Sequence, residues 1–385
     1  MRSHSYINSA RSVISTYDGS VPFAVWIKQF FKNHKKYGSK DRKEITHLCY
    51  SYFRLGKAFE NLPIEERILI GVFLSSSESN FVLGELKPQW NAEVPLPLRE
   101  KIRFLNVEQE IKTLFPFADE LSKEIDAPAF RTSFLVQPLL YLRIRPGKQE
   151  AVANKLQMAG MDFERIDQDC MALANSSKTD EVIHLNAEAV VQDRNSQKVL
   201  ELLQAEIRAD QMIKAWDCCA ASGGKSILLK DHFARAELTV SDVRESILVN
   251  LRKRFQQAGI SGYHSFVADV SSRQFSFPES FDLVICDVPC SGSGTWSRTP
   301  EQLLFFKKEK IEHYAQLQQA IALNAAKSVK QGGYLLYITC SVFQKENEEV
   351  ATFIQNHTAV QLVSWQYLKG YEKRADSLFA ALFRL

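Results

Sequence analysis

From about residue 190 onward, short apolar segments alternate with amphipathic helical stretches. Five segments read as strands: MIKAWD (212–217), ELTVSD (237–242), HSFVAD (264–269), DLVICD (282–287) and YLLYIT (334–339). Helical stretches such as ILVNLRKRFQQAG lie between them. Apolar strands separated by helices favour a parallel sheet that is covered by helices on both faces. The sequence therefore predicts an α/β, Rossmann-like domain with a mostly parallel sheet.

Four of these five strands end in aspartate, at Asp217, Asp242, Asp269 and Asp287. Ligands of an open parallel sheet bind beyond the carboxyl ends of its strands, so we expect the four carboxylates to gather at one crevice. The loop DCCAASGGKS (217–226) follows the first strand, and its small residues allow the backbone to approach a ligand. The loop matches neither the P-loop nor the GxGxxG spacing, and a lone glycine-rich turn is often only a tight turn. With Asp242 placed to hold a ribose diol, the pattern predicts a nucleoside-type cofactor.

Two smaller regions precede this domain. Residues 1–128 show helical spacing of apolar side chains, for example at Ile45, Leu48 and Tyr52, and predict a helical domain. Three prolines are expected to interrupt it with a loop (Pro88, Pro95 and Pro97). Residues 134–166 read as a strand, a turn, a helix and a second strand. We therefore expect a small α+β module over residues 129–188 and the Rossmann-like domain over residues 189–385.

The charge of the chain is unevenly distributed. The net charge is +3, but residues 1–60 hold 11 Lys and Arg against 4 Asp and Glu, so this segment carries +7 and the remainder −4. Such asymmetry favours a polyanion-binding face, although a solvated helix face would look the same. Seven cysteines, the absence of an export signal and the absence of an apolar run of about 18 residues favour a monomeric cytoplasmic protein with reduced thiols and no membrane partner.

Three motifs together resemble those of the Sun-type RNA cytosine-5 methyltransferases, which use S-adenosylmethionine. They are DCCAASGGKS, DVPCSGSG (287–294) with RTPE (298–301), and ITCSVFQKENEEV (338–350). The order and spacing match from VVQDRNSQ (190–197) to DSLFAALF (376–383). Upstream, FLVQPLLYLRIRPGK resembles the small module that precedes the catalytic domain in that family. The segment SKDRKEITHLCYSYFRLG resembles the NusB-like helical domain of the family's bacterial small-subunit rRNA member.

The resemblance implies methyl transfer to carbon 5 of a cytosine in RNA, with 16S rRNA as the expected substrate. Carbon 5 is a poor nucleophile, so Cys340 would first add to carbon 6 and push electron density onto carbon 5. Asp287 would contact the base, and Cys290 would assist release of the product. The implied cofactor residues are Cys219, Ala220, Ala221, Ser222, Gly223, Gly224, Lys225, Asp242, Asp269 and Asp287. The expected RNA contacts are Lys225, Arg298, Lys35, Lys36 and Arg42, and no metal is expected.

The chain departs from the family pattern at three positions. Ser222 stands where the cofactor loop usually has proline, Ser377 stands where the closing motif usually has glycine, and Ile247 replaces a common arginine. None of these differences removes a reacting group. A serine at position 222 does make the loop intrinsically less rigid than a proline would.

Other interpretations of the same residues stay open at this point. A catalytically silent RNA-binding scaffold would not need Cys340, Cys290 and Asp287 together. An N-methyltransferase on the same fold usually relies on an [ND]PP[YF]-type motif, where this chain has Asp287-Val288-Pro289-Cys290. The DNA cytosine methyltransferases use the Pro-Cys cysteine as nucleophile, which would make Cys290 the attacking group. A zinc site from four cysteines (Cys218, Cys219, Cys286 and Cys290) lacks a CxxC pair.

Overall fold

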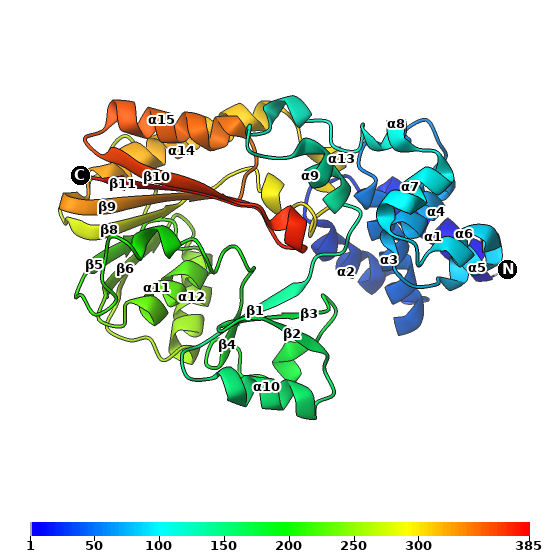
Figure 1. Ribbon diagram of the computed structural model, residues 1–385, viewed down its shortest axis with the longest axis horizontal. Helices are drawn as coiled ribbons and strands as arrows, with labels where there is room; N and C mark the ends of the chain where they lie inside the picture. The colour runs from blue at the N-terminus through cyan, green and yellow to red at the C-terminus, as the bar shows by residue number, and fades with distance from the viewer. Residues whose placement is uncertain (1) are drawn as a thin grey trace. The chain divides into compact units, whose positions relative to one another are not determined.

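The computed structural model describes residues 2–385, which form two compact units (Figure 1). The first unit comprises residues 2–119, 126–137 and 295–308, and the second comprises residues 120–125, 138–294 and 309–385. No helix in the described part of the chain is both long enough and apolar enough to cross a membrane. The three-domain division at residues 128 and 188 stays a prediction, since the compact units divide the chain at other positions.

The first unit is helical. Its helices are α1 (Arg2–Thr16), α2 (Phe23–Asn33), α3 (Ser39–Arg54), α4 (Ile64–Ser75), α5 (Phe81–Leu86), α6 (Pro88–Glu93), α7 (Leu98–Leu105), α8 (Glu108–Ile111), α9 (Ala127–Ser133) and α13 (Gln302–Phe305). Ile45 and Leu48 of α3 are fully buried, as their helical spacing predicted. The loop expected around Pro88 is wrong in part, because Pro88 begins α6, where its missing N–H costs no hydrogen bond.

A segment from the C-terminal half of the chain, residues 295–308, belongs to the helical unit. The Phe305 ring lies 5.1 Å from the Tyr17 ring, centroid to centroid. The Glu301 carboxylate accepts a hydrogen bond of 3.0 Å from the backbone N–H of Phe23 at the start of α2. A Cβ at Gly19 would lie 2.5 Å from the Phe305 ring, so only glycine fits there. This segment is therefore part of the core of the helical unit.

The second unit contains a small four-stranded antiparallel sheet. Its strands are β1 (Leu140–Ile144), β2 (Phe163–Asp167), β3 (Cys170–Leu173) and β4 (Ala189–Val191), in the order β2-β3-β1-β4. The helix α10 (Gln149–Met158) follows a turn in which Gly147 has φ of 74°. The predicted strand, turn, helix and strand are thus confirmed, whereas β3 and β4 were missed. Both are at most four residues long, too short to show a strand pattern of their own.

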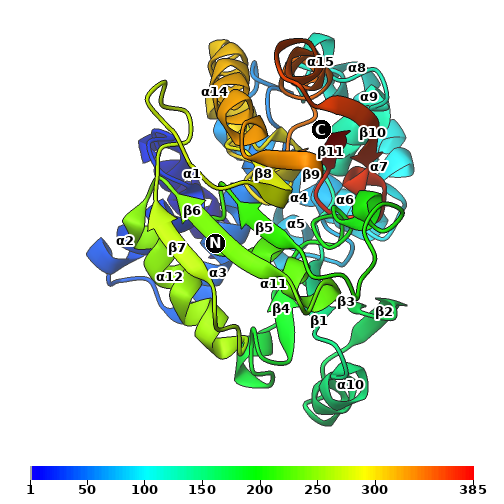
Figure 2. The ribbon, with the colours of Figure 1, turned by 90° about the vertical axis from the view of Figure 1, so that its left-hand side faces the viewer.

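The larger sheet of the second unit has seven strands (Figure 2). They are β5 (Lys214–Asp217), β6 (Glu237–Asp242), β7 (His264–Val267), β8 (Phe281–Asp287), β9 (Val329–Thr339), β10 (Gln361–Leu368) and β11 (Leu378–Arg384). Their order is β10-β11-β9-β8-β5-β6-β7, and the pairs from β9 to β7 are parallel while β11 is antiparallel to both its neighbours. This arrangement confirms the predicted α/β fold with a mostly parallel sheet. The two C-terminal strands were not predicted.

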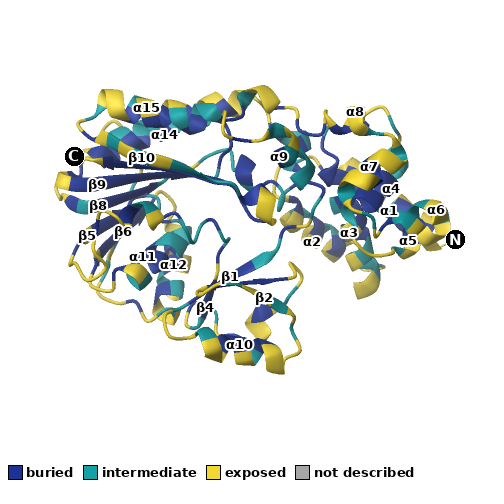
Figure 3. Ribbon diagram, viewed as in Figure 1, coloured by how far each residue is buried: buried dark blue, intermediate teal, exposed yellow. Residues whose placement is uncertain are grey.

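Helices cover both faces of the large sheet, so alternate residues of each strand enter two different cores. Leu283 and Ile285 of β8 pack on one face, whereas Val284 and Cys286 pack on the other. One core is completed by α11 (Gly224–His232) and α12 (Glu245–Gln257), and the other by α14 (Glu309–Ala326) and α15 (Glu348–His357). Figure 1 shows these two helix pairs on opposite sides of the strands, and Figure 3 shows that the strands between them are buried. The central strands are apolar because both of their faces are covered.

Candidate active site

The four aspartates follow four neighbouring parallel strands. Asp217, Asp242 and Asp287 are the last residues of β5, β6 and β8, and Asp269 lies two residues beyond β7. The strands lie side by side in the order β8-β5-β6-β7. Because the carboxyl ends of parallel strands meet at one edge of a sheet, the aspartates share the edge that the sequence pattern predicted.

Asp217 lies deepest of the four. Its side chain is 1% exposed and accepts a hydrogen bond of 2.6 Å from the Ser226 hydroxyl of α11. Burial raises the pKa of Asp217 to about 7, and the nearby negative charge of Asp287 adds to this. Asp217 therefore anchors the first turn of α11, where the expected cofactor loop (residues 219–225) ends.

Lys225 and Asp287 form an ion pair at the centre of this edge. The Lys225 Nζ lies 2.6 Å from Asp287 Oδ2, and both side chains are largely shielded from solvent. Burial opposes the ammonium charge, but Asp287, and after it Cys340, raise the pKa of Lys225 above its ordinary value. Lys225 is thus a fixed cation among acidic groups rather than a solvated lysine at a helix start.

The two motif cysteines meet at the ends of neighbouring strands. Cys340 directly follows β9, and Cys290 lies three residues beyond β8, which pairs with β9 in parallel. Their sulfur atoms are 3.2 Å apart. The hydrogen bond to Cys340 and then burial raise the pKa of the Cys290 thiol well above its ordinary value. The fold therefore brings two motifs that are 50 positions apart in the sequence together as one pair of thiols.

Hydrogen bonds fix the backbone around Cys340. The Thr339 hydroxyl donates to Asn347 Oδ1 at 2.6 Å, and Asn347 Nδ2 donates to the Ser341 carbonyl at 2.9 Å. The Gly294 N–H donates to the Cys340 carbonyl at 2.9 Å. A Cβ at Gly294 would lie 2.0 Å from the Ser377 carbonyl oxygen, so this position requires glycine. The strand end that carries Cys340 is consequently held from three directions.

The cofactor loop is held by backbone geometry and by a side chain that the sequence did not indicate. Ala221 and Gly223 have φ of 46° and 81°, and the Ala221 N–H donates to Asp242 Oδ2 at 3.1 Å. Arg254 of α12 donates from one Nη1 atom to the Ser222 carbonyl at 3.0 Å and to the Ser222 hydroxyl at 2.8 Å. This double contact restrains the loop at the position where serine replaces the usual proline.

Beyond the loop, the edge carries exposed apolar side chains next to its acidic ones. Val243 is 58% exposed directly after Asp242, and Val267, which pairs with Asp242 across β6 and β7, is 49% exposed. Asp269 Oδ1 is turned toward its own loop, where it accepts from the Ser271 N–H and hydroxyl. Acceptors flanked by bare apolar side chains suit a ribose and a flat base. The two valines were missed because isolated apolar residues after strands carry no distinctive signal.

Comparison with known proteins fits this geometry. Residues 202–378 match the family described as 16S rRNA methyltransferase RsmB/F. The match to this family is confined to that stretch. The stretch contains the cofactor loop and both cysteine motifs, so the RsmB/F match rests on the same residues as the site.

A curated relative and two solved structures are also similar to this chain. The chain is 29% identical over 230 residues to the probable ribosomal RNA small subunit methyltransferase B of Bacillus subtilis, covering 58% of this chain and 51% of the relative. It thus spans about half the length of that relative. The crystal structure of PH0851 superposes with a TM-score of 0.73 and 20% identity over 99% of this chain and 98% of that one. The structure of NSun6 from Pyrococcus horikoshii with SFG superposes with a TM-score of 0.59 and 14% identity, over 72% of this chain and 97% of that one. The two structures share the fold.

The predicted RNA contacts lie in the helical unit, apart from Lys225. Lys35 and Lys36 are exposed in the turn between α2 and α3, and Arg42 of α3 donates from Nε to the Tyr37 carbonyl at 2.9 Å. Arg298 is partly exposed in the 295–308 segment. Their contact with RNA stays a prediction. Among residues 2–385, no group of three or more His, Cys, Asp or Glu side chains is arranged to hold a metal ion, and this includes the four cysteines considered for zinc.

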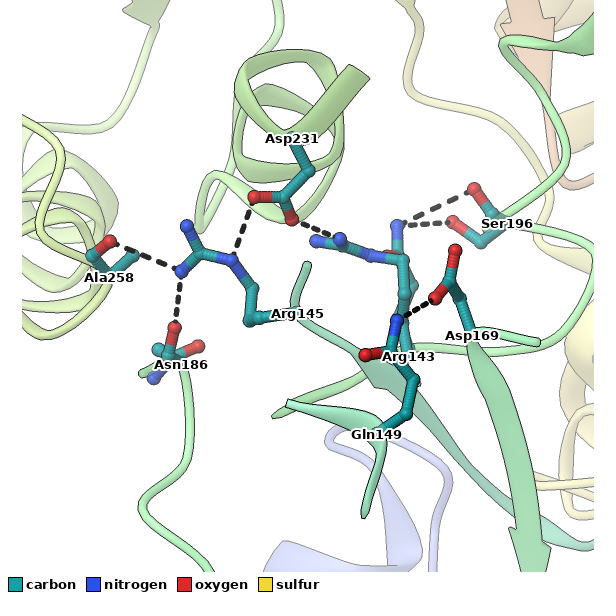
Figure 4. Close-up of polar contacts among 9 residues, drawn as sticks. Arg143, Arg145, Gln149, Asp169, Asn186, Ser196, Asp231 and Ala258 are labelled. Atoms are coloured by element: carbon teal, nitrogen blue, oxygen red, sulfur yellow. Dashed lines mark hydrogen bonds and ion pairs between the residues drawn. The ribbon is translucent and has the colours of Figure 1, made fainter. Parts of the chain in front are cut away.

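A buried ionic cluster links the small sheet of the second unit to α11 (Figure 4). Asp231, near the C-terminal end of α11, pairs with Arg143 of β1 through one carboxylate oxygen and with Arg145 through the other. Arg145 also donates to the carbonyls of Asn186 and Ala258. Separating a buried ion pair would leave its charges uncompensated, so the pairs resist being pulled apart. The cluster therefore restrains the C-terminal end of α11, the helix that begins at the cofactor loop.

Proposed function

We propose that this protein transfers a methyl group from S-adenosylmethionine to carbon 5 of a cytosine in RNA, through a covalent adduct between Cys340 and carbon 6. The observation that carries the proposal is the pair of sulfur atoms of Cys340 and Cys290, 3.2 Å apart at the ends of β9 and β8. The buried Lys225–Asp287 ion pair lies at the same edge. Two thiols, an ammonium and a carboxylate are the groups that addition to a pyrimidine and later elimination require.

The residues at the carboxyl ends of β6 and β7 fit an adenosine-type cofactor. Asp242 Oδ2 accepts one hydrogen bond and keeps acceptor capacity for a ribose hydroxyl. Val243 and Val267 offer exposed apolar surface for the base, and Asp269 lies two residues after Val267. The loop from Cys219 to Lys225 would then hold the remainder of the cofactor against the start of α11. S-adenosylmethionine, when bound, supplies an electrophilic methyl group on a positively charged sulfur.

Cys340 begins the proposed reaction. Its thiolate, facing the charge of Lys225, forms a bond to carbon 6, and the electron pair of the 5,6 double bond moves into the ring toward carbon 5 and nitrogen 3. Nitrogen 3 takes a proton from solvent as electron density reaches it, and Asp287 accepts hydrogen bonds from that N–H and from the exocyclic amine, which stabilises the protonated adduct. Carbon 5 would then be nucleophilic enough to accept the methyl group that S-adenosylmethionine would supply.

Release reverses the addition. The proton on carbon 5 leaves to a base, its electron pair restores the 5,6 double bond, and the bond between carbon 6 and Cys340 breaks with its electrons returning to sulfur. Cys290, whose sulfur lies 3.2 Å from that of Cys340, is the group that we assign to assisting this step, by donating a hydrogen bond from its thiol to the departing Cys340 sulfur. The pKa of the Cys290 thiol is raised, which fits a hydrogen-bond donor rather than the attacking thiolate.

The substrate class follows from the family. The matched family is described as acting on 16S rRNA, and we extend this substrate to the present chain, with the cytoplasm as its site of action. The basic residues of the helical unit, Lys35, Lys36 and Arg42 with Arg298, would supply phosphate contacts, which position RNA without specifying its sequence. A cytosine must leave its stack to reach a pair of half-buried sulfurs, so an unpaired or flipped nucleotide is the expected target.

Two cysteine variants test the assignment. Cys340→Ala should abolish both methylation and covalent protein–RNA species, since the group that forms the bond is gone. Cys290→Ala should still add to the base and transfer methyl but release product slowly, leaving an adduct that survives denaturing electrophoresis. Cys170→Ala, at a buried cysteine of the small sheet, serves as the control. An adduct that accumulates with Cys340→Ala and disappears with Cys290→Ala would make Cys290 the nucleophile and overturn the proposal.

A further inference from the structure

One buried carboxylate connects the residues that follow the two cysteines. Glu346 lies in the short helix η5 (Gln344–Glu346) and is 0% exposed. Its Oε2 accepts hydrogen bonds from the backbone N–H of Ser291 at 2.8 Å and from Gln318 Nε2 at 2.9 Å. Its Oε1 accepts from the Ser341 hydroxyl at 2.9 Å. Ser291 follows Cys290 and Ser341 follows Cys340, so one side chain touches both cysteine loops.

The partners of Glu346 are arranged for an ionised carboxylate. An ionised carboxylate accepts hydrogen bonds but donates none, and all three contacts run toward its oxygens. Burial raises the pKa of Glu346, while the bonds from Ser291, Ser341 and Gln318 oppose that rise. Gln318 is itself fixed, because its Oε1 accepts from the Tyr337 hydroxyl at 3.1 Å. The carboxylate is thus an anchored point between the ends of β8 and β9.

We propose that Glu346 is a positioning residue for both cysteines, holding the loop after Cys290 and the loop after Cys340 to a single point and so setting the spacing of the two sulfurs. Strand pairing does not reach the cysteines, since β8 ends at Asp287 and β9 at Thr339, and of the two only Cys340 packs against an apolar core of the large sheet. The meaning of that spacing for catalysis rests on the proposed function, but the spacing itself does not.

The same carboxylate distinguishes the two thiols electrostatically. Around Cys290 the titratable neighbours are Cys340, Glu346 and the hydroxyls of Tyr314 and Tyr337, and Glu346 disfavours a second negative charge there. Lys225, paired with Asp287, has its electrostatic contact with Cys340 instead. Glu346 should therefore keep Cys290 in its thiol form.

Two variants separate the positioning and the charge. Glu346→Met removes every hydrogen bond, whereas Glu346→Gln keeps a side chain of the same shape and part of the bonding but loses the charge. Glu349→Gln, three residues along the chain and exposed, is the matched control. Sulfur spacing is measured without RNA by titrating the folded protein with phenylarsine oxide, which binds two thiols only when they are close together. Thiol ionisation is measured by iodoacetamide alkylation against pH, with each cysteine quantified by mass spectrometry.

We expect Glu346→Met to weaken arsenical binding about tenfold and to lower kcat about 100-fold, with the KM for S-adenosylmethionine within twofold of the parent protein. Glu346→Gln should bind the arsenical normally but alkylate Cys290 several-fold to about tenfold faster near pH 8, as expected for a lower thiol pKa. If Glu346→Met fails to fold, Ser341→Ala provides the spacing test, since it removes one bond to the carboxylate and leaves its charge. Unchanged arsenical affinity in Glu346→Met, or in Ser341→Ala in its place, would overturn the proposal. Because the titrations use no RNA, a chain that proved unable to methylate RNA would sink the proposed function and leave this result standing.

Discussion

The carboxyl edge of the large sheet has two sides that are built differently. On the cysteine side, Cys290 and Cys340 sit among buried hydrogen-bonded groups such as Glu346. On the cofactor side, Val243 and Val267 are bare to solvent beside Asp242. The groups that we propose to make and break bonds are thus held in place in advance, whereas the side proposed to receive the cofactor leaves apolar surface for it to cover. Preorganised polar groups stabilise developing charge without reorganising during the reaction.

The largest effect should come from removing Lys225, the cation that pairs with Asp287. Lys225→Met removes the ammonium that faces Asp287 and Cys340, so the thiolate loses its compensating charge. We expect kcat to fall by about 10²–10³, the range for removing one preorganised charge-stabilising donor. Cofactor affinity, measured by calorimetry, should stay within about threefold. Lys330→Met, at an exposed ion pair with Asp282, is the control. If Lys225→Met lost cofactor affinity but kept its kcat, Lys225 would belong to the cofactor side rather than to the cysteine side.

An intermediate effect is expected on the cofactor side. Asp242→Ala removes acceptors for a ribose diol and the partner of the Ala221 N–H, and should weaken S-adenosylmethionine binding roughly tenfold to 100-fold. At saturating cofactor the rate should recover to near that of the parent protein. Asp210→Ala, at an exposed aspartate paired with Arg208, is the matched control. Calorimetry that shows unchanged cofactor affinity would remove Asp242 from the site.

The smallest effect tests how the cofactor loop is restrained. Arg254→Met deletes the two hydrogen bonds to Ser222, each worth about 0.5–1.5 kcal/mol, and should weaken cofactor binding about threefold to tenfold. Arg252→Met, on the same helix but paired with the exposed Glu245, should leave binding unchanged. The double variant Arg254→Met with Ser222→Pro should regain part of the loss if loop rigidity is what Arg254 supplies. No recovery there would mean that Arg254 acts through its other contact, with Asn186.

The sequence predicted the sheet because its central strands are buried on both faces and carry an unbroken apolar pattern. It also predicted which strand ends would meet, since Asp217, Asp242 and Asp287 each close a strand of one parallel sheet. The strands β10 and β11 were not foreseen. In the first half of β10 every second residue is exposed, so this strand has no continuous apolar run. The sequence of β11 overlaps the closing motif DSLFAALF, which indicates only a family resemblance. Antiparallel strands at a chain end lack the helix alternation that revealed the others.

The supporting residues of the site could not be predicted, because their roles depend on distances across the fold. Arg254 reaches Ser222 from 32 positions along the chain, and no spacing rule connects the two. Glu346 lies in a recognised motif, yet its contact with Ser291 exists only because β8 and β9 pair in parallel. Lys225 was expected among the RNA contacts, and its ion pair with Asp287 could not be inferred before the two strand ends were placed. Motifs identify reacting groups, whereas the groups that orient them emerge from the fold.

The inclusion of residues 295–308 in the helical unit has a consequence for how the protein is made. Tyr17 packs against Phe305, and Glu301 accepts a hydrogen bond from the backbone at Phe23, so the core of the helical unit contains residues from both halves of the chain. During synthesis, the N-terminal helices leave the ribosome long before this segment does, and they cannot complete their packing until residue 308 has emerged. Domains that are synthesised first usually fold first. Here the helical unit cannot finish folding until residues 138–294 of the second unit have also been synthesised. Cutting the chain after residue 137 would therefore leave two unfinished pieces, one lacking Phe305 and the other exposing it.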